Sequence, residues 1–482
     1  MSLIEYQKVS PGLFWLEIKE ANLKLMCGSP VDAIKHLGKA GKLDIKIIDG
    51  FYSEEGPNAI LLSDLFEQKG KVSNLSEFPL LHCLYKQGIL IPNHPNSKLP
   101  KPLLIGEANQ LQCQCNYFDR GNNGLMDLSE YQAFGVSDEV ATEWISIKKR
   151  FAYGEFPKSA DLFDLLELGL EKVEIKPEVF LKRTSLNQFE ISYKGETQEV
   201  DLNLEGPEEY EPTFELPKCG IPDAHFSIVH IGEGDGWDPT RPCFSSMVVF
   251  AGKKYILDAG PNIDFVLEAF DLTPADLEGV IFTHVHDDHF SGLFSLVSQN
   301  KGLKILATPA VYGCLIHKFS ALIGSDLEGA KELFDHIPLK PKQWNDVDGL
   351  ELYPHPSPHP IDTTVFVIRA KGQEGYKSYG HFADITCLNW LEKMTTPDAN
   401  GFGITMATKL SLADLYQTPL DLKKADIGGA PIHGVAEDFA QCDRENLVLG
   451  HTSRPLSPEQ LKIGRQAEFG EVEILIGKAP QL

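Results

Sequence analysis

The second half of the chain contains short apolar runs that repeatedly end in polar residues, and this pattern most constrains its fold. Short runs rich in Val, Ile and Phe are typical of strands. Their alternation with helical stretches predicts a mixed sheet system covered by helices. The expected helices are 263–270, 290–299, 310–323 and 457–469. The expected strands are 226–231, 245–250, 253–258, 279–284, 303–308, 363–368, 446–451 and 472–477.

One of these runs leads into IFTHVHDDHFSG, residues 281–292. His284 and His286 are two residues apart, so an extended chain points both imidazoles to one side. Asp288 and His289 follow at a bend. A chance origin of H-x-H-x-D-H in this chain has a probability on the order of one in a thousand. Because such groups would repel and desolvate one another without a cation, the motif predicts a metal site rather than a cluster of salt bridges.

Residues 222 to 482 resemble the metallo-β-lactamase superfamily of dinuclear metal hydrolases. THVHDDHFSG corresponds to the signature of this family, and four weaker motifs occur in the family's order: YILDAG, YPHPSPHP, YGHFADIT and LVLGHTS. The resemblance implies an α+β fold, an αββα sandwich with its ligands on loops along one edge. The family commonly has Gly where this chain has Ala383.

The resemblance also implies the ligands of two metal ions. It assigns the first ion to His284, His286 and His359, the second to Asp288, His289 and His451, and Asp384 to both. The prolines around His359 leave His355 open as an alternative third histidine. Asp258 is implied as a carboxylate that orients the signature loop.

Open coordination positions on both ions distinguish a catalytic site from a structural one. Two such ions lower the pKa of a water bound between them and polarise the oxygen of the bond to be cleaved, so the expected reaction is hydrolysis. We expect divalent ions, zinc first, although this ligand set also accepts iron or manganese. Asp288, Asp258 and His433 are the expected catalytic groups.

His433, in the glycine-rich stretch DIGGAPIHG, is the first candidate for the acid that protonates the leaving group. His381 is the second. A structural, hydrogen-bonded role stays open for each histidine. The glycine-rich stretch could equally bind substrate through its backbone N–H groups.

The expected substrate is a small ester-like molecule. IFTHVHDDHFSGLFSL is most similar to the phosphodiesterase and tRNA-processing branches of the superfamily, which favours a phosphodiester over thioesters and lactones. The net charge of −25 opposes binding of large nucleic acids or anionic membranes.

Two other classes stay open. One is redox chemistry on iron, as in sulfur dioxygenases with a single iron; the oxygen and nitric oxide reductases of this fold have Glu where His286 stands and need a flavin partner. The other is a scaffold without enzymatic activity, which the seven candidate ligands oppose.

A length of 482 residues predicts two domains. Residues 1–218 form the expected first domain, of mixed α+β type and unknown role, which ends in an acidic, proline-containing linker between Gly195 and Pro217. It could serve as a lid, a substrate-selecting wall or an oligomer contact, so a homo-oligomer is compatible with the sequence. Residues 222–482 form the expected hydrolase domain.

Within the first domain, the sequence predicts a helix over 159–173, a hairpin around Lys194 and Gly195, and a strand over 110–118. Residues 119–130 match part of a calcium-loop pattern, but Gly121 stands where a ligand belongs. We therefore expect a turn there.

The expected location is cytoplasmic. Glu5 and Lys8 interrupt the stretch in which a signal peptide would be apolar, and no uncharged apolar run has membrane-spanning length. The nine cysteines lack the even, tight spacing of a disulfide framework and are expected to be reduced.

Overall fold

Two units make up the chain in the computed structural model, which describes residues 2–479. The first contains Met1–Asp119, Pro157–Thr213 and Ser320–Ser325, and the second contains Arg120–Phe156, Phe214–Phe319 and Asp326–Leu482. Residues 120–156 therefore group with the second unit, whereas the division into 1–218 and 222–482 placed them in the first. A physical reason is the buried ion pair of Lys148 with Asp362.

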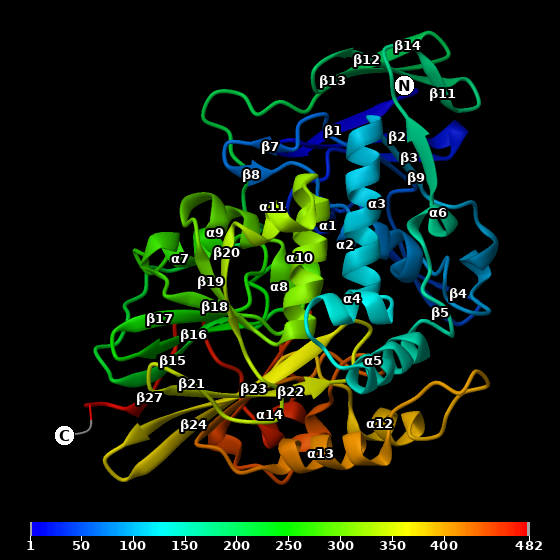
Figure 1. Ribbon diagram of the computed structural model, residues 1–482. Coiled ribbons are helices and arrows are strands. Elements are labelled where there is room, and N and C mark those ends of the chain that lie inside the picture. Colours follow the sequence, from blue (N-terminus) through cyan, green and yellow to red (C-terminus); the bar gives the residue numbers. More distant parts are fainter. Residues whose placement is uncertain (1, 480–482) are drawn as a thin grey trace. The chain divides into compact units, whose positions relative to one another are not determined.

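Two β-sheets carry the core of the second unit (Figure 1). Side chains from both sheets, such as Ile228, Val248, Phe366 and Ile368, form one buried cluster. The strand orders are β20-β19-β18-β17-β16-β15-β27 and β21-β22-β23-β24-β25-β26. The strands are β15 Phe226–Gly232, β16 Ser245–Phe250, β17 Lys253–Leu257, β18 Gly279–Ile281, β19 Leu303–Ala307, β20 Phe334–Pro338, β21 Asn345–Val347, β22 Leu350–Ser357, β23 Thr363–Gly372, β24 Gly375–Phe382, β25 Leu422–Asp426, β26 Leu447–Gly450 and β27 Val472–Ile476.

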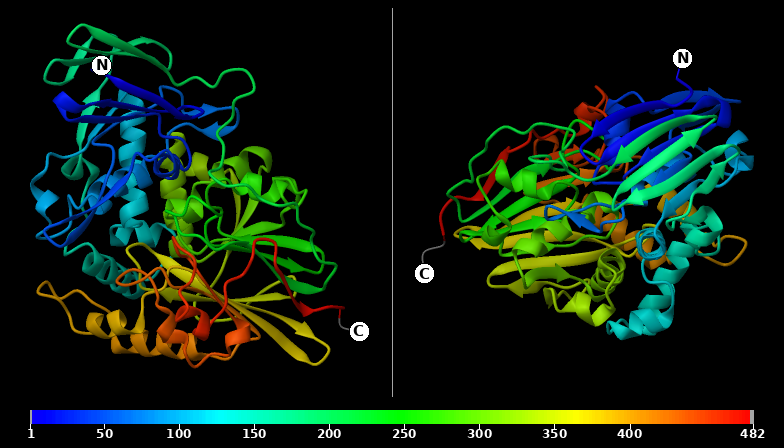
Figure 2. Two further views of the ribbon diagram at one scale, coloured as in Figure 1. Left: turned by 180° about the vertical axis from the view of Figure 1, so that it is seen from behind. Right: turned by 90° about the horizontal axis from the view of Figure 1, so that it is seen from above.

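Helices cover the outer faces of both sheets (Figures 1 and 2). The α+β class and the αββα sandwich predicted from the sequence are thereby confirmed, as are the eight expected strands. The expected helix over 457–469 is too long, because only α14, Gln460–Ile463, is helical there. The helices are α4 Leu128–Ala133, α5 Asp138–Phe151, α7 Ile263–Glu268, α8 Asp287–Phe290, α9 Leu293–Gln299, α10 Pro309–Ile323, α11 Leu327–Lys331, α12 Leu388–Met394, α13 Met406–Gln417 and α14 Gln460–Ile463.

Parallel pairing brings several strand ends to one edge of each sheet. In one sheet β17 pairs in parallel with β18, with Leu257 opposite Ile281. In the other, β24, β25 and β26 run in parallel, with Phe382 opposite Ala425 and Asp426 opposite Gly450. The residues that directly follow these strands therefore lie near one another along each edge.

The first unit also packs two sheets against each other. Leu16 and Leu25 of one sheet and Leu181 and Ile191 of the other belong to a single buried cluster. The sheet orders are β1-β2-β3-β6-β9-β10 and β11-β12-β13-β14. The strands are β1 Glu5–Ser10, β2 Leu13–Ile18, β3 Leu23–Cys27, β6 Ala59–Leu61, β9 Leu103–Gly106, β10 Asp164–Glu167, β11 Val173–Lys176, β12 Val179–Ser185, β13 Gln188–Tyr193 and β14 Glu196–Asp201. Two short pairs, β4 Asp44–Ile48 with β5 Phe51–Glu55 and β7 Glu67–Gln68 with β8 Lys71–Val72, and helices α1 Ala33–Lys39, α2 Glu77–Leu81, α3 Ala108–Asn123 and α6 Ser159–Leu162 complete the named elements.

The predicted hairpin around Lys194 and Gly195 is confirmed by the pairing of β13 with β14. The acidic stretch predicted as a linker therefore begins with a strand. The expected helix over 159–173 is wrong, because after α6 the chain extends as β10 and pairs in parallel with β9.

The expected strand over 110–118 is also wrong. This segment lies in α3, and its buried residues Leu111, Gln114, Cys115 and Phe118 follow helical spacing. The prediction failed because a polar residue, Gln114, is buried on the inner face of this helix. Its side chain accepts hydrogen bonds from the backbone N–H and the hydroxyl of Ser76. In the calcium-like stretch, Glu130 is ion-paired with Arg120.

Within residues 2–479 no helix combines the length and the hydropathy that a membrane span requires. The nine cysteines are free.

We predict that Asp362→Ala lowers the free energy of unfolding of the second unit by roughly 3–5 kcal/mol. The Lys148 ammonium lies 2.7 Å from Asp362, both side chains are fully buried, and the substitution would leave a buried charge unpaired. Urea unfolding measures the change. Lys377→Ala, which breaks a largely exposed pair with Asp421, is the control and should cost less than about 1 kcal/mol. Equal effects of the two substitutions would contradict this prediction.

Candidate metal centre

The predicted site residues follow strand ends in both sheets of the second unit. Asp258 follows β17, the H-x-H-x-D-H motif follows β18, Asp384 comes two residues after β24, and His451 follows β26. Asp258, Asp384 and His451 adopt left-handed backbone conformations, with φ of 66°, 46° and 59°. For residues other than Gly this conformation costs of order 1–3 kcal/mol and persists only where the surroundings fix it. The structure thus concentrates backbone strain at these positions.

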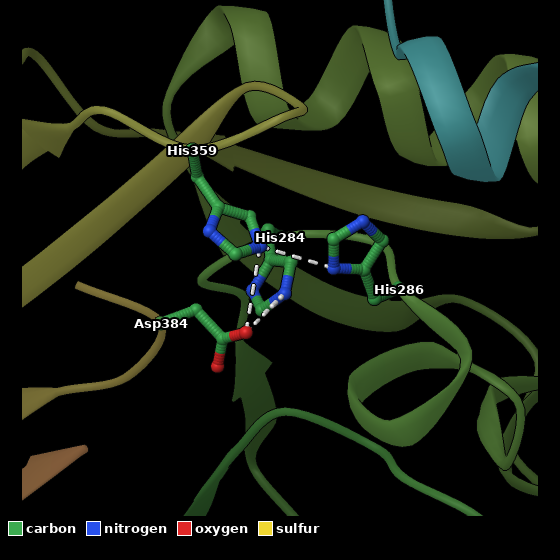
Figure 3. Close-up of side chains that lie close together, drawn as sticks. All are labelled: His284, His286, His359 and Asp384. Carbon is green, nitrogen blue, oxygen red and sulfur yellow. Dashed lines mark hydrogen bonds and ion pairs between the residues drawn. The ribbon is translucent and has the colours of Figure 1, made fainter. Parts of the chain in front are cut away.

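Four residues form a first cluster, His284, His286, His359 and Asp384, whose ligand atoms lie within 4.8 Å of one another (Figure 3). His359 Nε2 lies 3.1 Å from His286 Nδ1 and 3.4 Å from Asp384 Oδ2. His284 Nε2 lies 3.5 Å from the same carboxylate oxygen. The three histidines therefore converge with one oxygen of Asp384.

Asp288, His289 and His451 form a second cluster. The Nε2 atoms of His289 and His451 are 3.3 Å apart, and His451 Nε2 lies 3.3 Å from Asp288 Oδ2. The other carboxylate oxygen of Asp384, Oδ1, lies 3.0 Å from His289 and 3.2 Å from His451. Asp384 therefore presents one oxygen to each cluster.

The donor atoms fit a pair of metal ions. Tetrahedral ligands about 2.1 Å from a zinc ion are about 3.4 Å apart, close to the separations found in both clusters. Contact between two imidazole nitrogens, as between His289 and His451, requires a proton or a cation. His284 Nε2 is buried and has no hydrogen-bond partner among residues 2–479. Imidazole and carboxylate donors accept zinc, iron and manganese.

The protonation of the histidines differs between the clusters. Burial lowers the pKa of His286 and His359 well below the usual range, so both imidazoles are neutral, as metal ligands must be. Burial opposes protonation of His289 too, but three neighbouring carboxylates outweigh it and raise its pKa to about 10. The second cluster thus carries negative charge that a proton or a metal ion must balance.

Asp258 anchors the signature loop. Its carboxylate accepts hydrogen bonds from the backbone N–H and the hydroxyl of Thr283, at 2.7 and 2.6 Å, and pairs with His289 Nδ1 at 2.8 Å. The carboxylate therefore turns His289 Nε2 toward Asp384. Such partners fix the orientation of a ligating imidazole.

Asp426, the last residue of β25, has a similar role for two further histidines, and it was not among the residues predicted from the sequence. Its carboxylate lies 3.1 Å from His433 Nδ1 and 3.4 Å from His451 Nδ1. It also accepts hydrogen bonds from the N–H groups of Ile385 and Gly428. Its position at the end of a strand, which it shares with Asp258 and Asp384, is the sequence feature from which it could have been predicted.

His433, which is partly exposed, and the buried Asp426 form an acid–base pair beside Asp384. Burial opposes protonation of His433, but the Asp426 carboxylate outweighs it and raises the pKa of the imidazole. Burial would raise the pKa of Asp426, but His433 and His451 lower it to about 2. His433 therefore holds a proton more readily than a free histidine does.

The two alternative histidines lie elsewhere. His355 contacts Pro356 O and Ser411 Oγ through its two ring nitrogens and is not in either cluster. His381 is fully buried, bonds to the Tyr379 hydroxyl, and has its pKa lowered well below the usual range by burial. A neutral, buried imidazole is a poor proton donor.

Two histidines at the centre are partly exposed to solvent. Asp288, His289, His359, Asp384 and His451 are buried. His286 is partly buried, and the His433 side chain is 19% exposed.

Residues 238–368 match the family model described as the metallo-beta-lactamase superfamily. The cGMP-dependent 3',5'-cGMP phosphodiesterase A of Dictyostelium discoideum is 25% identical over 154 residues, which are 32% of this chain and 18% of that protein. Ribonuclease Z of Pyrobaculum aerophilum is 35% identical over 68 residues, and that of Pyrobaculum islandicum over 85 residues, covering 13% and 17% of this chain and 24% and 28% of the relatives. The chain thus spans less than a third of the length of these relatives.

Two solved structures are similar over 52% of this chain. The metallo-beta-lactamase fold protein YhfI from Bacillus subtilis has 15% sequence identity, a TM-score of 0.38 and 98% of its own chain covered. Human tRNase Z, short form (ELAC1), has 16% identity, a TM-score of 0.37 and 99% of its chain covered. The family-model match contains the H-x-H-x-D-H motif, so residues 238–368 are similar to the metallo-β-lactamase superfamily, as the sequence motifs predicted.

Proposed function

We propose that this chain is a metal-dependent hydrolase that cleaves a phosphodiester bond in a small substrate. The observation that carries the proposal is Asp384, whose two carboxylate oxygens face two separate clusters of histidines. A carboxylate in this position can be shared by two cations.

The proposed ligands are His284, His286 and His359 for the first ion and Asp288, His289 and His451 for the second, with Asp384 shared. When bound, two divalent ions would lower the pKa of a water at the site and polarise the oxygen of the scissile group. Zinc is the expected metal, with iron or manganese as alternatives.

The other side chains have distinct tasks in this proposal. Asp258 and Asp426 orient His289 and His451, which fixes the second cluster. His433, whose pKa the Asp426 carboxylate raises and which is partly exposed, donates a proton to the oxygen of the leaving group. Asp288, Asp258 and His433 thus remain the proposed catalytic set, although Asp258 acts through His289.

A phosphodiester is favoured because the similar proteins include a cyclic-nucleotide phosphodiesterase and two ribonucleases Z. A small substrate is favoured over RNA because the net charge of −25 repels a polyanion. Thioester and lactone hydrolysis and iron-dependent redox chemistry are the competing functions. The cytoplasmic location remains a prediction from the sequence.

His286→Ala should abolish hydrolysis and reduce bound metal without unfolding the chain, because it removes one proposed ligand of the first ion. Elemental analysis, the assay and circular dichroism measure these effects. His355→Ala is the matched control: it removes a buried histidine outside both clusters and should leave the metal content unchanged. Wild-type turnover by His286→Ala would refute the ligand assignment, and one iron per wild-type chain would favour the dioxygenase reading.

His433→Gln should slow cleavage of a phosphodiester with an alkoxide leaving group by roughly 10²–10⁴-fold, the usual contribution of a general acid. A p-nitrophenolate leaving group needs little protonation, so its cleavage should change much less. Metal content should stay at the wild-type value. Equal losses with both leaving groups would show that His433 does not act as the acid.

The metal-loaded protein should hydrolyse a small phosphodiester such as a cyclic nucleotide in preference to a thioester, a lactone or precursor tRNA. Full removal of metal by a chelator should stop the reaction, and adding metal back should restore it. Activity on only one of the other substrates would contradict the phosphodiester proposal and would identify that substrate class as the correct one. Activity that survives verified removal of all metal would exclude the mechanism.

A further inference from the structure

A buried lysine outside both clusters links the two sheets of the second unit. Lys424 lies on β25 and is fully buried. Its ammonium donates hydrogen bonds to Gly232 O at 2.8 Å and Ser245 O at 2.6 Å, and it lies 2.7 Å from Glu233 Oε1. These acceptors belong to the end of β15 and the start of β16, in the facing sheet. One cation therefore joins the sheets.

Glu233, the partner of this lysine, contacts the segment that carries His451. The backbone oxygen of Glu233 accepts a hydrogen bond from the His451 N–H at 2.9 Å. A Cβ on Gly450 would lie 2.6 Å from Glu233 Oε2, so the carboxylate packs directly on the backbone that precedes His451. Both the main chain and the side chain of Glu233 thus hold this segment.

Phe244 adds a second connection between the lysine and the histidine. The Lys424 ammonium lies 4.6 Å from the centre of the Phe244 ring, and the His451 ring meets the same ring edge-on with centroids 5.6 Å apart. His451 is also one of the residues with positive φ, which its surroundings must enforce. The Lys424–Glu233 pair and Phe244 supply part of those surroundings, together with Asp426.

Stability alone does not explain a charged pair at this place. Removing two charges from water costs free energy that their attraction often fails to recover, and well-packed apolar side chains of the same size are commonly at least as stable. The geometry gives the pair another role, because its contacts lead to a proposed ligand.

We propose that the Lys424–Glu233 ion pair is a positioning device that holds His451 in place and thereby sets the affinity of the second metal position. The inference rests on the proposed function, because His451 is a ligand only within that ligand set. It concerns two residues outside both clusters of proposed ligands, so they act through His451.

The test compares metal binding by the full-length wild-type protein and by the double variant Glu233→Gln/Lys424→Met. Replacing both charges with neutral side chains of similar shape avoids leaving one buried charge unpaired. After chelation, zinc is added back and the two binding steps are followed by calorimetry. We expect the affinity of the second ion to fall about 10–100-fold, the usual effect of losing a partner that orients a ligand, and that of the first ion to stay within about threefold.

Lys423→Met provides a matched control on the same strand. Lys423 is also buried, but it donates to Tyr416 O and Cys442 Sγ, away from Glu233. This variant should bind both ions as the wild type does. Urea unfolding of the metal-free proteins should show that all of them are folded.

The proposal fails if the double variant binds both ions with wild-type affinity, if it loses both ions equally, or if Lys423→Met weakens the second ion as much. If the wild-type protein itself binds fewer than two ions, the ligand set is wrong, and this inference falls with it. The two failures are therefore distinguishable.

Discussion

Four buried carboxylates converge on the histidines at the metal centre, and the need to balance their charge governs this part of the molecule. Asp258, Asp288, Asp384 and Asp426 are at most 6% exposed. Histidines alone balance this charge only by staying protonated, as the raised pKa values of His289 and His451 indicate. Divalent ions in the same volume balance it with neutral imidazoles as ligands. Metal binding should therefore release protons, and it should stabilise the second unit because the unfolded chain has no such site.

The two sheets make it possible for these charged side chains to converge, because their strands give the loops rigid starting points. Each contributing loop begins at a strand end, and parallel pairing aligns these ends within each sheet. The left-handed conformations of Asp258, Asp384 and His451 then turn the side chains toward the centre. Hydrogen bonds to Thr283, Ile385 and Glu233 hold the turned segments. Strain at the site is thus balanced by contacts with strands that are themselves buried.

The sequence predicted the second unit well because its signals are local. Its buried strands contain continuous apolar runs such as 247–250, and H-x-H-x-D-H is a dense cluster that chance rarely produces. In the first unit the signals were weaker. Buried glutamines in α3 made a helix look like an alternating strand, and leucines in 164–167 that pair with β9 made an edge strand look helical. Tertiary contacts, which no local pattern encodes, decided both segments.

The residues that support the centre were harder to predict than the proposed ligands, and KKAD at 423–426 shows why. Lys423 and Lys424 are chemically identical neighbours, yet strand alternation sends them to opposite faces. One donates to Tyr416 and Cys442, and the other reaches the facing sheet and Glu233. Asp426, two residues on, shares the face of Lys424 and pairs with His433 and His451. The register of β25 within its sheet therefore decides which lysine faces the other sheet and supports the site. That register depends on pairing with the neighbouring strands β24 and β26 rather than on the sequence of β25 alone.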